Sequence, residues 1–225
     1  MAVKKSGEEK AAKPKKIKVE IDRTALEKEW WAEGFDRIAG VDEVGRGCMF
    51  GDVVAAAVIL PTGLKIEGVD DSKKLSEKKR EELFDVIMRE AVAVGVGRVD
   101  PVTIDRINIK QASRLAMKMA VEALGEQPDG LLVDAERIDV DLPQRAVIKG
   151  DSLSQSIGAA SIIAKVTRDR LCAGEWEQDY PGYGIAVHKG YGTAVHRDRI
   201  LELGISPLHR HSFLVKMKEQ HEKLR

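Results

Sequence analysis

Four carboxylates in the sequence follow closely after short apolar runs, in positions where acidic side chains could act together. They are Asp42, Glu43, Asp134 and Asp151. If the apolar runs are strands, these residues stand at strand ends, where ligand sites of α/β sheets are usually found. Burying several like charges together is unfavourable unless a cation lies among them. Oxygen ligands suit Mg²⁺ or Mn²⁺ rather than zinc, and two such ions would activate an attacking water and stabilise a leaving oxygen in phosphodiester hydrolysis.

Each carboxylate also has a simpler explanation. A lone Asp at a strand end is usually a turn or helix-cap residue, and Asp151 directly precedes a predicted helix. Asp42 and Glu43 pose a geometric problem as well, because adjacent strand residues point to opposite faces of a sheet. The glycines of Gly45-Arg46-Gly47 offer an escape, since they allow the backbone to twist. Spacing alone therefore leaves both a metal site and separate structural carboxylates open.

The elements that must position these residues are those of an α/β domain. Five apolar segments are predicted to be strands: 37–41, 53–60, 91–99, 131–133 and 146–148. The second is almost entirely Val, Ala, Ile and Leu, which is typical of a strand buried on both faces. Apolar periodicity predicts helices at 22–35, 76–89, 108–124 and 154–171, and two short ones at 194–203 and 212–224. The segment 180–193, rich in Gly, Tyr and His, is predicted to be a functional loop.

Composition limits the class of protein. With 225 residues, 43% hydrophobic and 33% charged, the chain suits one globular domain with tails. It has no apolar run near the roughly 20 residues that span a bilayer, and residues 1–18 are lysine-rich, unlike a secretory signal. Cys48 and Cys172 give neither a disulfide framework nor a zinc spacing. We therefore expect a cytoplasmic protein. A net charge of zero argues against simple coating of nucleic acid, but it is compatible with an acidic site inside a basic rim.

Five motifs, in order along the chain, resemble those of the ribonuclease HII family, the type 2 ribonucleases H. They are IAGVDEVGRG at 38–47, DSKKLS at 71–76, LVD at 132–134, KGD at 149–151 leading into AASIIAKVTRDR at 159–170, and HKGYGT at 188–193. The similarity runs from about residue 25 to about residue 214. The short segment before it differs from the related type HIII enzymes, which carry a much larger N-terminal domain.

The resemblance implies a ribonuclease H-like α/β fold, with a mixed five-stranded sheet flanked by helices and a small helical C-terminal extension. The lysine content predicts a flexible basic tail at 1–20 and the apolar spacing a lead-in helix at 21–36; the catalytic domain is then expected at 37–205 and the extension at 206–225. The implied activity is that of an endoribonuclease that cuts the RNA strand of RNA–DNA hybrids and incises 5′ of ribonucleotides embedded in duplex DNA. Those nucleic acids are its expected partners, two Mn²⁺ or Mg²⁺ ions its cofactors, and a monomer its expected state.

Residue by residue, the resemblance assigns catalysis and metal binding to the four carboxylates Asp42, Glu43, Asp134 and Asp151. Gly45, Arg46 and Gly47 match the element that reads the 2′-hydroxyl of a ribonucleotide and the adjoining phosphate. Tyr191 matches the tyrosine that stacks on the sugar at an RNA–DNA junction. These roles suit a protein that must distinguish RNA from DNA, because the 2′-hydroxyl is the distinguishing group.

Other side chains are open to two interpretations. Lys73 is a candidate phosphate contact, although a solvated lysine fits the sequence as well. Asp169 could lie near the metals or form an ion pair with Arg168 or Arg170. The histidines have no zinc-like spacing, and we interpret them as surface or substrate-groove residues. They are His188, His196, His209 and His211.

Residues 48–52 depart from the family pattern. They read Cys-Met-Phe-Gly-Asp where the family has proline, two small apolar residues, glycine and proline. Met49 and Phe50 are bulkier and Asp52 adds a carboxylate, which questions the geometry of ribonucleotide recognition; Cys48 is expected to pack inside. A catalytically impaired hybrid-binding protein is therefore an alternative. A nucleotide-binding α/β protein fits less well, because the glycine fingerprint and the Walker lysine are absent.

Overall fold

The computed structural model describes residues 21–215 and 217. A five-stranded sheet in the order β3-β2-β1-β4-β5 lies at its centre. The strands are β1 Ile38–Val44, β2 Val53–Ile59, β3 Ala93–Val99, β4 Gly130–Asp134 and β5 Gln144–Val147. β1, β2 and β3 are antiparallel neighbours, whereas β4 and β5 join in parallel on the other side of β1. The mixed five-stranded sheet is confirmed. The predicted basic tail at 1–20 lies outside the described residues.

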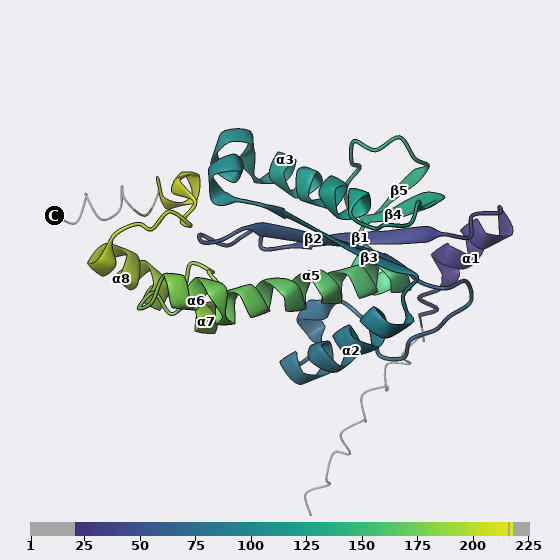
Figure 1. Cartoon of the computed structure of the whole chain (residues 1–225), viewed down its shortest axis with the longest axis horizontal. Coiled ribbons are helices and arrows are strands. Elements are labelled where there is room, and N and C mark those ends of the chain that lie inside the picture. The colour runs from purple at the N-terminus through teal and green to yellow at the C-terminus, as the bar shows by residue number, and fades with distance from the viewer. Residues whose placement is uncertain (1–20, 216, 218–225) are drawn as a thin grey trace, which may run out of the picture.

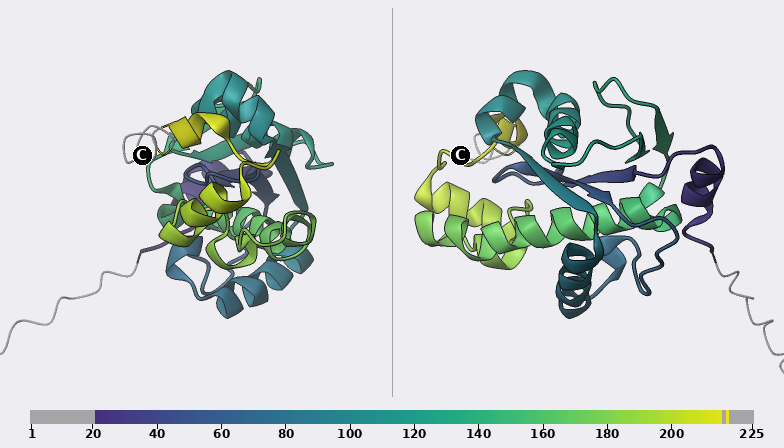
Figure 2. Two further views of the ribbon diagram at one scale, coloured as in Figure 1. Left: turned by 90° about the vertical axis from the view of Figure 1, so that its left-hand side faces the viewer. Right: turned by 45° about the vertical axis from the view of Figure 1, so that its right-hand side comes forward.

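Helices cover both faces of this sheet. They are α1 Ala25–Ala32, α2 Glu77–Glu90, α3 Pro101–Glu122, α4 Gly150–Leu153, α5 Gln155–Ala173, α6 Glu175–Asp179, α7 Ile185–His188 and α8 Ala194–Leu203, with a 3-10 turn η1 Ser72–Lys74. Figure 1 shows α3 on one face and α5 with α2 on the other. Figure 2 shows α6, α7 and α8 gathered at the end of the molecule opposite α1. In the described ranges, no helix is long and apolar enough to cross a membrane.

The burial of β2 explains its sequence. All seven residues, VVAAAVI, are buried, because alternate side chains enter the two cores on either side of the sheet. Val53 and Ile59 pack in the core under α3, whereas Val54 and Val58 pack in the core under α5 and α2. A strand covered on both faces needs apolar residues at every position, as the sequence predicted.

The glycines of β3 have a packing function. Glycine is unfavourable inside a strand, yet β3 pairs with β2 along its whole length. A Cβ on Gly95 would lie 2.1 Å from the carbonyl oxygen of Ala120, and one on Gly97 would lie 2.1 Å from that of Ala116. Both glycines therefore let α3 approach the sheet closely.

The helix predicted at 108–124 begins earlier, at Pro101. The side chain of Asp100 caps it by accepting the N–H of Thr103 at 2.9 Å, and proline suits the first turn. Asn108 interrupts the helix with φ 66°, and its side-chain oxygen accepts the N–H groups of Lys110 and Gln111. Asn108 therefore caps the second part of α3, which is the part whose periodicity the sequence showed. The shorter helix predicted at 76–89 is confirmed, and Ser76 caps it.

The last predicted helix, at 212–224, is only partly described. Residues 211–215 are helical. A separate apolar cluster joins this end of the chain to α6, α7 and α8. Its buried members are Phe50, Cys172, Trp176, Tyr183, Ile185, Ile200, Leu214 and Met217.

Candidate active site

Asp42 and Asp134 leave two neighbouring parallel strands side by side. Val41 of β1 is paired in register with Val133 of β4, so the residue that follows each is a carboxylate at the same edge. β1 stays regular through Val44, and the first left-handed glycine, Gly45 with φ 94°, comes after both acidic residues. The twist that we expected to bring Asp42 and Glu43 to one face therefore does not occur: Asp42 points toward the α5 side and Glu43 toward the α3 side.

Asp42 is the most deeply buried of the four predicted carboxylates, with 4% of its surface exposed. It accepts the N–H of Glu43 at 2.7 Å. Burial raises the pKa of Asp42 well above its usual range, and the charges of Glu43 and Asp134 raise it further. Burial also raises the pKa of Glu43, where Arg46 opposes the shift and Asp134 adds to it. These carboxylates therefore interact electrostatically across the edge of the strand.

Asp134 and Asp151 are joined through the start of α4. The N–H of Gly150 donates to Asp134 at 2.7 Å, and Asp151 is the next residue. The cap of α5 is Ser154, whose hydroxyl accepts the N–H of Ile157, so the helix-cap explanation of Asp151 is wrong. Burial raises the pKa of both carboxyls, and Asp134 adds to the shift of Asp151.

Lys73 lies among these acidic groups. Burial by itself lowers the pKa of its ammonium, but nearby carboxylates raise it overall. The carboxylates are Asp42, Asp71, Asp151 and Asp134. The neighbouring Lys74 instead contacts Asp70 at 3.3 Å and the hydroxyl of Ser152 at 2.7 Å. Lys73 is exposed, as a solvated lysine would be, but its ammonium lies close enough to these carboxylates for their charges to raise its pKa. Asp71, which sequence reasoning saw only as part of a motif, belongs to the same cluster.

The chemistry of this cluster fits a hard divalent cation. All of its acidic donors are carboxylate oxygens, which Mg²⁺ and Mn²⁺ prefer. Their pKa values are raised first by burial and then by the neighbouring carboxylates, and a cation would offset both effects. Across residues 21–215 and 217, however, no three His, Cys, Asp or Glu side chains are already arranged to hold one metal ion. Asp42 and Glu43 in particular alternate across β1 and point to opposite faces of the sheet.

Arg46, a predicted substrate contact, extends back over Glu43. Its guanidinium lies 3.2 Å from a carboxylate oxygen of Glu43 and 3.8 Å from one of Glu136, while 41% of the side chain stays exposed. Arg114 of α3 also pairs with Glu136, at 2.8 Å. Glu136 and Arg114 were missed in the sequence; the only signal was that Glu136 lies two residues after Asp134. Arg46 therefore joins the loop to the acidic cluster.

Two buried arginines hold the loop that follows β1. Arg168 of α5 donates to the carbonyl oxygens of Asp52 at 3.0 Å, Phe50 at 2.8 Å and Lys189 at 2.8 Å. Arg210 donates to the carbonyl oxygens of Gly51 at 2.9 Å and Gly45 at 2.7 Å. Both side chains are fully buried. Because a planar guanidinium donates in several directions at once, two side chains fix most of the peptide groups between residues 45 and 52.

The ion pair predicted between Asp169 and its helix neighbours is wrong. Asp169 pairs with Lys165 at 2.7 Å and with Arg80 at 3.8 Å. Arg168 points inward to the loop, and Arg170 points outward to Glu81. Residues adjacent on a helix do not face each other, which explains the difference.

The unusual residues 48–52 are structural. Phe50 and Cys48 are fully buried, and the Phe50 ring lies 4.9 Å from that of His209 and 5.7 Å from that of Tyr180. Asp52 pairs with Arg98 at 2.8 Å, which neutralises the added carboxylate away from the acidic cluster. The bulky side chains thus anchor the loop in the C-terminal apolar cluster, and the expected packing of Cys48 is confirmed.

The two predicted substrate-reading elements lie side by side. A Cβ on Gly47 would lie 3.9 Å from the ring of Tyr191, and Cys48 forms an isolated β-bridge with Tyr191. Tyr191 keeps 40% of its surface exposed. The expectation that the histidines are surface or groove residues is wrong for His196 and His209, which are buried, because they pack beneath this tyrosine.

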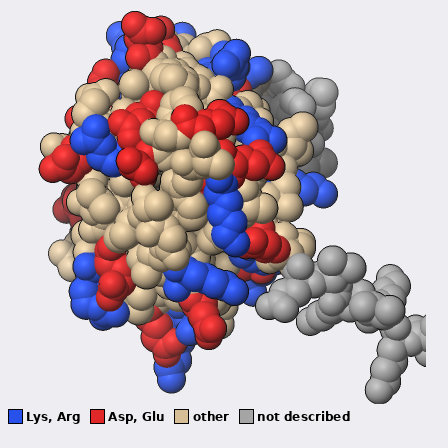
Figure 3. Space-filling model, turned by 90° about the vertical axis from the view of Figure 1, so that its right-hand side faces the viewer, with Lys and Arg blue, Asp and Glu red and all other residues tan. Residues whose placement is uncertain are grey.

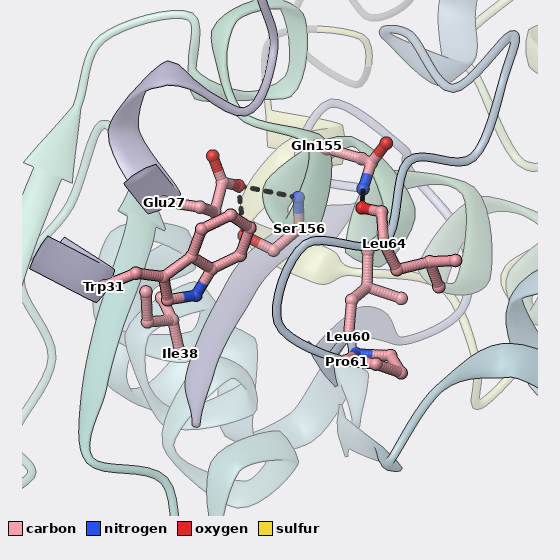
Figure 4. A pocket seen from close by; sticks show the side chains of 8 residues that line it. All are labelled: Glu27, Trp31, Ile38, Leu60, Pro61, Leu64, Gln155 and Ser156. Carbon is pink, nitrogen blue, oxygen red and sulfur yellow. Dashed lines mark hydrogen bonds between the residues drawn. The ribbon is translucent and has the colours of Figure 1, made fainter. Parts of the chain in front are cut away.

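The lead-in helix α1 supports the site from the other end. Glu27 is 4% exposed, and one of its oxygens accepts the N–H of Ser156 at 3.0 Å and its hydroxyl at 2.7 Å (Figure 4). The same oxygen accepts the hydroxyl of Ser154 at 2.6 Å. These serines lie at the start of α5, three and five residues after Asp151. Trp30 and Trp31 of the same helix pack on a small apolar cluster that includes Ile157 of α5. On this end of the molecule, acidic and basic side chains are intermixed rather than separated by sign (Figure 3).

Known proteins are similar to this chain over most of its length. The family model described as Ribonuclease HII matches residues 39–216. A ribonuclease HII from Alkaliphilus metalliredigens (strain QYMF) is 60% identical over 203 residues, covering 88% of this chain and 99% of the relative. One from Geobacter sp. (strain M21) is 59% identical over 201 residues, covering 89% and 87%.

Solved structures show the same architecture. The ribonuclease H2 from Pyrococcus horikoshii OT3 superposes with a TM-score of 0.70 at 27% identity, covering 83% of this chain and 99% of that one. Bst-RNase HIII, solved in complex with Mn²⁺, superposes with a TM-score of 0.64 at 22% identity, covering 84% and 71%. The sheet and its flanking helices are therefore those of this group of structures.

Proposed function

This chain belongs to the ribonuclease HII family and is thus an endoribonuclease of the ribonuclease H type, and we propose that it incises 5′ of ribonucleotides in duplex DNA by two-metal-ion hydrolysis. The single observation that supports this mechanism most strongly is the electrostatic coupling of Asp42, Asp134 and Asp151 around the Lys73 ammonium. The proposed ligands are the four carboxylates Asp42, Glu43, Asp134 and Asp151.

The chemistry assigns separate tasks to the residues of the cluster. When bound, two Mn²⁺ or Mg²⁺ ions activate a water and stabilise the departing 3′-oxygen. Asp42 and Asp134, at the ends of adjacent parallel strands, provide the rigid pair of ligands, whereas Glu43 reaches from the other face. Lys73 keeps a positive charge beside the carboxylates, where a scissile phosphate would otherwise be repelled.

Ribonucleotide recognition is proposed for Gly45, Arg46, Gly47 and Tyr191. Arg210 holds the carbonyl oxygens of Gly45 and Arg46 at 2.7 and 3.2 Å, which fixes the peptide groups of the turn. The ring of Tyr191 beside Gly47 is placed to stack on a sugar whose 2′-hydroxyl contacts the turn. We further propose that the protein acts as a cytoplasmic monomer on RNA–DNA hybrids and on ribonucleotide-containing duplex DNA.

An incision assay tests the proposal. Duplex DNA with one embedded ribonucleotide, and a uniform RNA–DNA hybrid, are incubated with and without Mg²⁺ or Mn²⁺. We expect metal-dependent cutting that Asp42→Asn abolishes. Asp52→Asn is the matched control, because it removes a buried carboxylate that pairs with Arg98 outside the cluster. Binding without cutting under either metal would support the hybrid-binding alternative. If the protein neither binds nor cuts these substrates, both functions are refuted.

Thermal unfolding gives a second measurement. Added Mn²⁺ should raise the midpoint of wild type, because a ligand that binds only the folded state stabilises it. Asp42→Asn should show a smaller rise, whereas Asp52→Asn should respond like wild type. In the absence of metal, Asp42→Asn should be at least as stable as wild type, since it removes one charge from a cluster of like charges.

A further inference from the structure

Two fully buried histidines form a continuous chain of hydrogen bonds that ends on the main chain of Tyr191. His196, in α8, and His209, in the segment after it, are 0% and 1% exposed. Their Nε2 atoms lie 3.2 Å apart. At one end, Nδ1 of His196 lies 2.9 Å from the carbonyl oxygen of Tyr191; at the other, Nδ1 of His209 lies 3.0 Å from the main-chain nitrogen of Ser206.

The partners at the two ends determine every proton in this chain. The main-chain N–H of Ser206 can only donate, so Nδ1 of His209 accepts and its proton is on Nε2. The hydroxyl of Ser206, 2.8 Å from the same Nδ1, then also acts as a donor. That proton is donated to Nε2 of His196, whose own proton must then be on Nδ1. A carbonyl oxygen can only accept, and Nδ1–H of His196 donates to that of Tyr191. All three bonds are satisfied by one pair of neutral tautomers.

Burial favours this neutral state. It lowers the pKa of each ring to about 4. A proton added to His196 would set its Nε2–H against that of His209. A proton added to His209 would end the bond from the main-chain N–H of Ser206 and leave the Ser206 hydroxyl, 2.8 Å away, as the acceptor at that end. The chain is therefore fully bonded only while both imidazoles are uncharged.

The same residues join the two substrate-reading elements. Phe50 forms an isolated β-bridge with His209, and Cys48 forms one with Tyr191, so residues 48–50 run between the two ends of the chain. The carbonyl oxygen of Tyr191 also accepts the N–H of Thr193 at 2.8 Å, which leaves its peptide group held from two sides. His209 is thereby connected to the main chain of Tyr191, whose ring lies beside Gly47.

We propose that His209 and His196 form a positioning relay that sets the main chain of Tyr191 and, through it, the fit of its ring on the sugar of a ribonucleotide. The relay rests on the proposed function, because it deepens the role given there to Tyr191. Neither histidine touches substrate. Both act through the tyrosine.

Two substitutions at one position separate the relay from a purely structural role. His209→Asn keeps an acceptor for Ser206 but loses the link to His196. His209→Gln keeps a donor for His196 but loses the acceptor for Ser206. Tyr183→Phe is the control: it removes a 3.0 Å bond to the carbonyl oxygen of Gly204 in the same apolar cluster without touching the chain.

We expect His209→Asn to raise the KM for a single-ribonucleotide duplex by roughly five- to tenfold, the size of one lost hydrogen bond, with a smaller change in kcat. His209→Gln and Tyr183→Phe should leave KM within about twofold of wild type. In a Tyr191→Ala background the effect of His209→Asn on KM should disappear, since the ring that it positions is gone. Equal effects of the two His209 variants, or an effect that persists without the Tyr191 ring, would overturn the relay.

Nitrogen NMR of the unliganded wild-type protein tests the chain without any activity. His196 should show the Nδ1–H tautomer and His209 the Nε2–H tautomer, and the Tyr191 and Thr193 amide signals should shift in His209→Asn but not in Tyr183→Phe. Any other pair of tautomers in the wild-type protein refutes the proposal, and this result does not depend on whether a variant folds. Unmoved Tyr191 and Thr193 amide signals in a folded His209→Asn variant refute it as well. A wild-type protein that cuts nothing while showing these tautomers would instead refute the proposed function.

Discussion

Replacing Glu27 should destabilise the protein although this residue is far from the acidic cluster in sequence. Its buried Oε1 accepts three hydrogen bonds from the start of α5, whereas Oε2 has no hydrogen-bond partner among the residues that the structure describes. Figure 4 shows the carboxylate between α1 and Ser156, beside a space of about 10 Å³ lined by Trp31 and Leu60. A cavity of that size admits at most one water.

The loss of stability in Glu27→Ala depends on which of these groups can form other hydrogen bonds after the substitution. The hydroxyls of Ser154 and Ser156 already lie 3.1 Å apart and can bond each other, but the N–H of Ser156 would be left buried without an acceptor. An unpaired buried group costs about 1–3 kcal/mol, and weakening of the two hydroxyl bonds adds roughly 1 kcal/mol. Glu27→Ala should therefore lower the free energy of unfolding by about 2–4 kcal/mol. Glu27→Gln, which retains an acceptor, should lower it by about 1 kcal/mol.

Urea unfolding at neutral pH measures these differences. Glu29→Ala is the matched control on the same helix, because Glu29 is exposed and pairs with Arg145 on the surface. Such a pair contributes about 0–1 kcal/mol. Since α4 carries Asp151 three residues before Ser154, Glu27→Ala should also raise the metal concentration needed for half-maximal cutting. Equal stabilities for Glu27→Ala and Glu29→Ala would refute this account of the α1–α5 junction.

Three further predictions follow from individual residues. Acid should destabilise the fold through His196 and His209, whose pKa is about 4 in the folded protein against an ordinary 6.5. Because the unfolded chain takes up protons at a higher pH than the folded one, the free energy of unfolding should fall as the pH is lowered from 7 to 4. The expected loss is roughly 3 kcal/mol for one ring. Urea titrations at pH 7, 6 and 5 check this, and a flat profile would contradict it. Gly40→Ala should lower the free energy of unfolding by about 3 kcal/mol or more, because its Cβ would lie 2.0 Å from the main chain of Ser156. Gly47→Ala, whose Cβ would have its nearest neighbour at 3.9 Å, should keep the stability of wild type and raise KM. Comparable melting temperatures for the two variants would refute this prediction. Ala135→Gly should stabilise the protein by about 0.5–1 kcal/mol, since Ala135 has φ 50° directly after Asp134; a lower melting temperature would show that the strain is offset elsewhere.

The parts of the fold that follow a local pattern could be predicted. The apolar run of β2 marked a strand buried on both faces, and Ser76 marked the start of α2. Asp134 could be placed at a strand end because the apolar run stops there. The start of α3 at Pro101 could not be predicted, since Asn108 breaks the apolar periodicity in the middle of a longer helix.

The supports of the site depend on contacts between distant segments, which no local pattern shows. Arg168 stands beside Asp169 in the sequence and suggests a surface ion pair, yet its acceptors are carbonyl oxygens of residues 50, 52 and 189. His196 and His209 come within hydrogen-bond distance because α8 and the following segment pack around Phe50. The motif resemblance located the carboxylates, but the strand geometry that separates Asp42 from Glu43 required the structure.

The zero net charge conceals two regions of opposite sign. Within residues 21–215 and 217, Arg168 and Arg210 form no ion pair with a carboxylate; their partners are mainly neutral carbonyl oxygens. Burial lowers the pKa of Arg210 to about 10, so it stays charged at neutral pH. Carbonyl oxygens accept most of the guanidinium hydrogen bonds without cancelling the charge, and Nη2 of Arg210 has no partner among the residues that the structure describes. The loop at 45–52 therefore has positive charge beneath it, next to the acidic cluster. Under the proposed function, we therefore expect a phosphate to be attracted by the loop and repelled by the carboxylates until divalent ions bind.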